Sequence, residues 1–131
     1  MMACDPLAAV MRYMRQPFAW GLRTDCTVAC VAFEAIHGVD PLEECMARYM
    51  TALGAARIIK RAGGYLEWCR ATFDLIETGT PQTGDLVLIK SADAFGAALA
   101  ICVSPGEYAM KSEAGMVITR AKHLGAWQCR S

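Results

Sequence analysis

The sequence lacks an excess of charge of either sign. Its 131 residues include 13 Lys and Arg and 13 Asp and Glu, so the formal net charge is zero. A chain without a basic surplus has no bulk electrostatic attraction for nucleic acid, and we expect no nucleic-acid partner. The same neutrality protects the chain only weakly from self-association, which fits a subunit of an assembly.

Long hydrophobic runs and targeting signals are also absent. No stretch of 18 or more apolar residues occurs, which predicts no membrane span. The opening segment MMACDPLAAVMRYMRQ lacks the basic start and the long apolar stretch of a signal peptide. We therefore expect the protein to be made and kept in a reducing cytoplasm. The seven cysteines are odd in number and show no disulfide framework, which predicts free thiols.

Motifs for common cofactors are missing as well. Gly63-Gly64 is not followed by the Lys-Ser/Thr of a phosphate-binding loop, and no CxxC pair occurs. Cys26 and Cys30 are four residues apart and share a helix face, so two thiolates could point together. Zinc would need two further ligands, and the remaining cysteines are scattered along the chain. We expect no cofactor and no metal.

What is present favours a folded domain with extensive apolar packing. Hydrophobic residues make up 55% of the chain and charged residues 20%, so either the core is large or a partner covers part of the surface. The length predicts one domain over residues 1–131.

The hydrophobic period changes along the chain. Helical spacing, caps and glycine stops predict helices at residues 5–16, 24–37, 40–53, 55–62 and 65–73. After a turn-rich joint at 78–84, apolar runs predict strands at 85–90, 97–103, 107–111, 115–119 and 126–129. A helical part (about 1–75) followed by an antiparallel β part (about 84–131) indicates an α+β fold.

Thr24, Asp25 and Cys26 stand at the start of the predicted second helix. Thr24 is a good N-cap, and Asp25 lies at the positive end of the helix dipole. That dipole favours the thiolate of Cys26, which is how several cysteine hydrolases present their nucleophile. The alternative is that Cys26 is a small buried hydrophobe, because the helix is apolar almost all round and is expected to be enclosed by other elements.

Two landmarks follow each other in the chain, Trp20-Gly21…Asp25-Cys26 and Gly84-Asp85-Leu86-Val87-Leu88. Their order resembles the NlpC-like branch of the papain-like cysteine peptidases, which cut peptides of bacterial cell walls. More narrowly, it is similar to a family of short phage and prophage tail proteins related to that branch. The resemblance extends over Gly38-Val39-Asp40-Pro41, Arg48-Tyr49, Gly54-Ala55-Ala56-Arg57 and Trp127. It implies an NlpC-type, papain-like α+β fold, with a central Cys26-bearing helix among N-terminal helices packed on a C-terminal antiparallel sheet.

The resemblance also implies that the catalytic base is missing. Active members of the branch begin the second strand of the sheet with a histidine, and Ala98 stands at the corresponding position. An alanine cannot take a proton, so Cys26 would lack its partner.

Two histidines remain as candidate bases. His37 follows Cys26 by eleven residues on the same predicted helix, about 16 Å away, and is interpreted as a residue of its last turn. His123, in the predicted loop before the last strand, could act as the base, with Asp25 or Asp85 as the orienting carboxylate. Alternatively, His123 is a surface residue and Asp85 a turn residue.

These observations lead to three hypotheses of different classes. The leading one is a structural protein of the tail tip or hub of a phage or phage-like particle, assembled in the bacterial cytoplasm and bound to other tail proteins. The second is an active peptidase or amidase that cuts peptidoglycan peptides during host penetration. The third is a peptidoglycan-binding module. Trp127 could serve the core or an interface.

Overall fold

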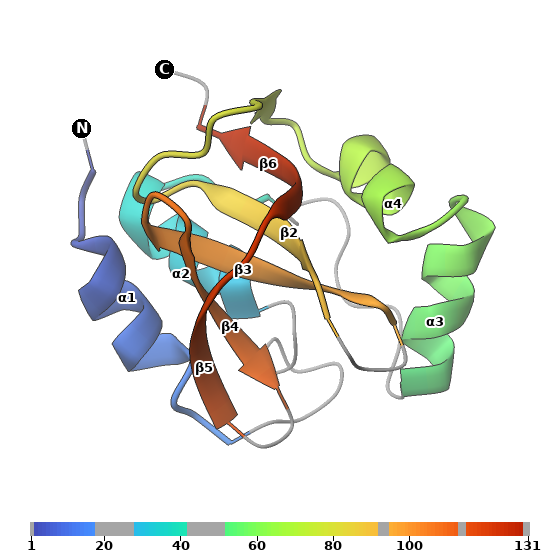
Figure 1. Cartoon of the computed structure of the whole chain (residues 1–131), viewed down its shortest axis with the longest axis horizontal. Helices are drawn as coiled ribbons and strands as arrows, with labels where there is room; N and C mark the ends of the chain where they lie inside the picture. Colours follow the sequence, from blue (N-terminus) through green and yellow to red (C-terminus); the bar gives the residue numbers. More distant parts are fainter. Residues whose placement is uncertain (1, 18–27, 42–51, 92–94, 113–114, 130–131) are drawn as a thin grey trace.

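The computed structural model describes residues 2–17, 28–41, 52–91, 95–112 and 115–129. The helices are α1 (Pro6–Tyr13), α2 (Val28–His37), α3 (Ala52–Arg61) and α4 (Tyr65–Thr72). The strands are β1 (Ile76–Glu77), β2 (Leu86–Lys90), β3 (Ala97–Ser104), β4 (Glu107–Ser112), β5 (Gly115–Arg120) and β6 (His123–Gln128). All six strands form one antiparallel sheet in the order β1-β6-β2-β3-β4-β5 (Figure 1).

Local signals set the ends of the first two helices. The Asp5 carboxylate accepts from the backbone N–H of Ala8 at 3.0 Å, and Pro6 occupies the first helical position, where its missing N–H costs nothing. Helix α2 ends at Gly38, whose φ of +78° is readily adopted only by glycine. The predictions of a cap at Asp5 and a stop at Gly38 are confirmed.

The sheet is strongly curled. Strand β5 is its last strand on one side and β6 lies beyond β2, yet only Ala121 and Lys122 separate β5 from β6. So short a link cannot span a flat sheet four strands wide, because neighbouring strands are about 4.8 Å apart. The chain instead passes in front of β3 as it runs from β5 into β6 (Figure 1). The curled sheet therefore encloses part of its own second face.

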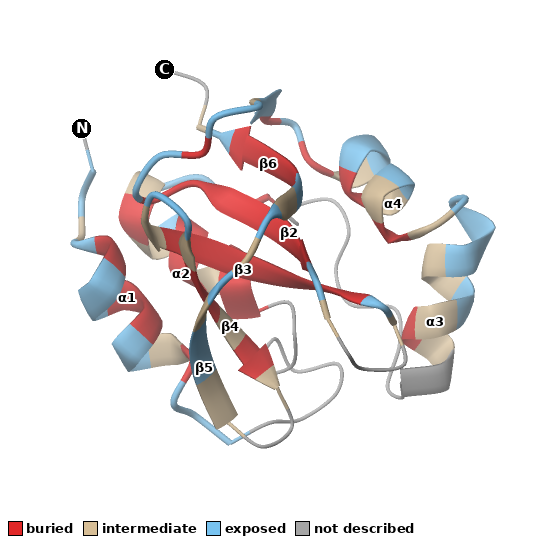
Figure 2. Ribbon diagram, viewed as in Figure 1, coloured by how far each residue is buried: buried red, intermediate tan, exposed pale blue. Residues whose placement is uncertain are grey.

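Both faces of the central strands are consequently buried (Figure 2). On one face, Leu86, Leu88, Leu99 and Ile101 pack with α1, α2 and α4. On the other, a second apolar cluster occupies the concave side of the curl; it consists of Val87, Ile89, Ala100, Cys102, Tyr108 and Ala126. Alternate residues of β2 and β3 thus serve two different cores, which explains their continuous apolar runs.

The predicted NlpC-type fold with a central cysteine-bearing helix is wrong for the described chain. The four helices are short, and α2 packs beside α1 on one face of a six-stranded sheet, where both helices contact β3, instead of lying at the centre of a helical half. The nearly continuous apolar character of α2 led to this error. Its buried side chains contact both α1 and the strands, so a helix that packs against a second helix and a sheet has the same apolar pattern as an enclosed helix.

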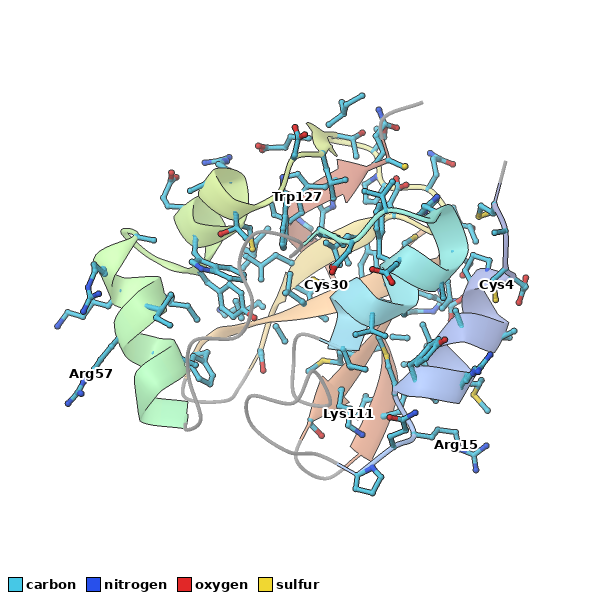
Figure 3. All side chains as sticks on the ribbon, turned by 180° about the vertical axis from the view of Figure 1, so that it is seen from behind. Cys4, Arg15, Cys30, Arg57, Lys111 and Trp127 are labelled. Carbon is cyan, nitrogen blue, oxygen red and sulfur yellow. The ribbon has the colours of Figure 1, made fainter. Side chains whose placement is uncertain are left out.

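Other sequence expectations have mixed outcomes. Strand β6 begins at His123, three residues before the predicted start, so His123 lies in a strand and not in a loop. Trp127 is buried in the helix-facing core, with its ring 5.3 Å from that of Phe73 (Figure 3). The predicted helix over residues 40–53 falls almost entirely outside the described residues. In the described part of the chain, no helix is long and apolar enough to cross a membrane.

Two features tie distant parts of the chain together. The buried ammonium group of Lys111 on β4 donates to the backbone carbonyls of Met14, at 2.7 Å, and Gln16, at the end of α1 (Figure 3). A cation there meets the negative end of the helix dipole. In β6, Gly125 leaves room for the side chain of Leu66, because a Cβ at position 125 would lie 2.7 Å from its Cδ1 atom.

Candidate functional site

The predicted catalytic residues are only partly placed by the structure. Asp25 and Cys26 lie outside the described residues, so their distance from an imidazole is not defined. Ala98 lies buried in β3, opposite Ile89 of β2. His123 pairs with the same Ile89 from the other side, across β2. Residues 98, 89 and 123 thus lie in line across β3, β2 and β6. The alanine at position 98 cannot titrate, and His123 is two strands away from it.

His123 borders a surface pocket at the β1–β6 edge of the sheet. The pocket has a volume of about 440 Å³ and is lined by Glu77, Thr78, Gly79, His123, Leu124 and Gly125. The Glu77 carboxylate is held by the guanidinium of Arg70, with Nη2–Oε2 and Nε–Oε1 distances of 3.1 Å. This pairing raises the pKa of Arg70 and fixes the carboxylate as an acceptor. The pocket thus offers an imidazole beside a carboxylate that is already engaged.

A second group of polar residues lies at the start of β2. The buried Asp85 carboxylate accepts from the backbone N–H of Gln82 at 2.8 Å, and the Asp85 N–H donates to the Gln82 carbonyl at 3.0 Å. Burial raises the pKa of Asp85, while the Gln82 N–H and the nearby His37 act in the opposite direction. The interpretation of Asp85 as a turn residue is confirmed by these two bonds.

His37 and Gly84 complete this group. The Nε2 atom of His37, at the end of α2, lies 2.8 Å from the carbonyl oxygen of Gly84, so Nε2 carries the proton and donates. Gly84 has a φ of +97°, and a Cβ there would lie 2.9 Å from the Met2 sulfur and 3.4 Å from His37 Nε2. The bond joins the last turn of α2 to the turn before β2.

Cys102 lies next to Asp85, and its cross-strand partner Tyr108 lies beside it on the concave side of the sheet. The Cys102 N–H donates to the Asp85 carbonyl at 2.9 Å, and its thiol lies 3.1 Å from the Ser104 carbonyl. Burial, followed by the charge of Asp85, raises the pKa of Cys102 to about 11. Burial and Cys102 also raise the pKa of Tyr108. A thiol with such a pKa is protonated at neutral pH and is a poor nucleophile.

The Asp85–Cys102 contact was not predicted from the sequence. Gly84-Asp85 before an apolar run indicated the turn, but Cys102 was one of several scattered cysteines. Their proximity depends on the β2–β3 register, in which Leu86 lies opposite Ile101. No local signal encodes this register, because both strands are apolar on both faces.

The described cysteines also bear on metal binding. Cys4, Cys30, Cys69, Cys102 and Cys129 form no disulfides. Within the described ranges, no group of three or more His, Cys, Asp or Glu side chains gathers as a metal site would require. Cys30 is fully buried in α2 (Figure 3), and its predicted companion Cys26 lies outside the described residues.

Comparison with known families assigns the chain to one family. A family described as a domain of unknown function, DUF6950, matches residues 5–129. The chain belongs to the DUF6950 family. A search of the curated proteins finds no match. The DUF6950 match runs from the N-cap of α1 to just past the end of β6, so the curled sheet, its helices and both polar groups belong to the family's domain.

Proposed function

We propose that this protein is a structural component of the tail tip or hub of a phage or phage-like particle. In this role it is assembled in the bacterial cytoplasm and stays in the particle bound to other tail proteins. The order of its sequence motifs, which resembles that of short phage tail proteins, supports the proposal. The uncovered apolar surface described next carries it.

Helix α1 exposes large apolar side chains away from the core. Leu7 and Met11 are 48% and 39% exposed, and they lie four residues apart on one face of the helix. Met2, just before the helix, is also exposed. The helix is buried on one side and exposed on the other (Figure 2), and its buried side packs Ala9 and Val10 against the core, so apolar side chains occur on both sides of α1. An apolar outer stripe on a chain without net charge is typical of a surface that another protein covers.

The chemistry of Cys102 and His37 supports a structural role over an enzymatic one. The Cys102 thiol is buried and its raised pKa keeps it protonated. The Nε2 atom of His37 is engaged by the Gly84 carbonyl. The imidazole joins the end of α2 to the turn before β2, the thiol contacts the Ser104 carbonyl within the sheet, and neither is disposed to attack a peptide bond.

The direct test is the composition of assembled particles. The protein should be found by mass spectrometry in purified particles, at a constant ratio to other tail proteins. A Leu7→Glu/Met11→Glu variant should be lost from particles, while Leu124→Glu should be retained, because Leu124 is 47% exposed on β6, away from α1. Absence of the unaltered protein from purified particles would contradict the proposal.

Two further assays test the enzymatic hypothesis and the peptidoglycan-binding hypothesis. Purified protein is incubated with muropeptides, and Cys26→Ala is compared with Cys30→Ala. Cleavage that only Cys26→Ala abolishes would replace the structural role with a peptidase. Sedimentation with purified sacculi in the absence of cleavage would instead indicate a peptidoglycan-binding module. The structural role predicts neither cleavage nor co-sedimentation.

A further inference from the structure

Strand β5 forms one edge of the sheet. It pairs with β4 over all six residues, from Gly115–Ser112 to Arg120–Glu107, without a register shift. In the described part of the chain, β4 is the only strand that pairs with it. A strand paired on one side presents backbone N–H and C=O groups along the other side, and these can bind only another extended chain in the same regular way.

This edge lacks the devices that usually protect exposed strands. Such devices are short length, proline, a bulge or a central charge. The opposite edge, β1, is two residues long and so is protected by its shortness. In β5 the four central residues, Met116-Val117-Ile118-Thr119, are all uncharged, and the only charge is Arg120 at its end. The two edges are therefore built differently, and β5 retains the features of a strand that acquires a partner.

Two adjacent apolar side chains of β5 are exposed, one on each face of the strand, while Met116 is partly buried against the core. Val117 and Ile118 are adjacent in the strand and point to opposite faces, yet they are 44% and 43% exposed. On the neighbouring strand β4, their cross-strand partners are Met110 and Ala109, and Ala109 is fully buried. Burial thus falls sharply from β4 to β5. One further strand beside β5 would cover apolar side chains on both faces at once.

We propose that β5 pairs antiparallel with β5 of a second copy of this chain, about a two-fold axis at Val117. When the two-fold axis is perpendicular to the sheet, side chains on one face of the first copy continue the same face of the second copy. Only two odd-numbered or two even-numbered residues of β5 can then lie opposite each other. With Val117 opposite Val117 of the second copy, Met116 lies opposite Ile118 of that copy, and Ile118 opposite its Met116. Every central apolar side chain then meets an apolar side chain.

The two-fold register that is shifted by one residue toward Arg120 is less complementary. With the axis at Ile118, Met116 lies opposite Arg120 of the second copy, and Val117 opposite its Thr119. The Arg120 side chain is 82% exposed and would lie beside an apolar partner instead of solvent. The strand's own sequence thus favours the axis at Val117, and the formal net charge of zero opposes no such self-association.

Disulfide trapping tests the register directly. Directly opposed Cα atoms in antiparallel strands are about 4.5–5.5 Å apart, within the range that a disulfide bridges. Val117→Cys should therefore give a 117–117 disulfide between copies under mild oxidation, identified by peptide mapping. Thr119→Cys is the matched control, because residue 119 lies opposite position 115 and the two copies of residue 119 are about 13 Å apart. It should give little disulfide-linked dimer.

Association of the unaltered protein is measured by sedimentation from about 10 µM to about 1 mM, the range suited to a small interface. Val117→Lys places two like charges at the axis and should weaken dimerisation at least about tenfold. Leu124→Lys, an equally exposed site on β6, should not weaken it. A chain that stays monomeric throughout, or equal trapping at positions 117 and 119, overturns the proposal. These assays need no other tail protein, so their outcome is independent of the proposed function.

Discussion

Raising the pH should destabilise the fold through Cys102. Its thiol is fully buried, and burial together with the charge of Asp85 raises its pKa from 9.0 to about 11. Because the pKa of Cys102 is higher in the folded than in the unfolded state, the neutral thiol contributes to the free energy of unfolding fully below pH 9. This contribution is lost as the pH rises through about 11. Two pKa units correspond to about 3 kcal/mol of unfolding free energy.

The assay is urea unfolding followed by tryptophan fluorescence at pH 8 and at pH 11, with the unaltered protein and Cys102→Ala. The variant should be about 1 kcal/mol less stable at pH 8, because it loses buried contacts. Between the two pH values, however, it should lose about 2 kcal/mol less than the unaltered protein, because the folded thiol is only half ionised at pH 11. Comparing the two chains cancels the titration of groups that they share.

Site-resolved alkylation provides an independent readout of the same group. In the native protein at pH 8, Cys102 should resist iodoacetamide, because it is buried and protonated, whereas the partly exposed Cys4 should react. Both should react in urea. Parallel pH curves for the two proteins, or rapid native alkylation of Cys102, would refute the reasoning.

Three other predictions concern stability. Lys111→Met should cost about 2–3 kcal/mol by urea unfolding, since it leaves carbonyls at the end of α1 without a donor. The exposed Lys90→Met should cost no more than about 0.5 kcal/mol, and equal losses would contradict the assigned role. Gly125→Ala should cost about 1–3 kcal/mol because its Cβ has no room, whereas Gly79→Ala, in open space, should not; similar melting temperatures would argue against this close packing. Because the pKa of Asp85 is raised in the folded state, its protonated carboxyl contributes to the free energy of unfolding fully below pH 3.8, and this contribution is lost as the pH rises through the folded pKa. Asp85→Asn should remove this pH dependence of stability. An unchanged stability–pH curve in the variant would disprove the role of Asp85.

Features that depend on a few neighbouring residues were predicted well. The Asp5 cap needs only a carboxylate three residues before a free N–H, and the stop at Gly38 needs only a residue that adopts positive φ. The turn at Asp85 likewise depends on a bond to Gln82, three residues away. Such interactions form within one turn of chain, so their signals are contained in short segments.

Features that join distant segments were missed or misjudged. The apolar pattern of α2 suited both an enclosed helix and a helix that packs beside α1 on a sheet, and the fold prediction chose wrongly. His123 was placed in a loop, because the irregular pairing near Leu88 and Ile89 interrupts the alternation that would reveal a strand. The contact between Asp85 and Cys102 depends on register alone.

By itself, the sequence determined where most of the described helices and strands occur, which turns separate them and that the chain carries no net charge. Only the tertiary structure decided that the sheet curls so that β5 leads directly into β6, that Cys102 lies against Asp85, and that β5 pairs, among the described strands, with β4 alone. The physical reason is the distance along the chain over which each interaction acts. Caps and turns are local bonds, whereas curl, register and edges follow from strand pairings across the chain, which continuous apolar runs leave unspecified.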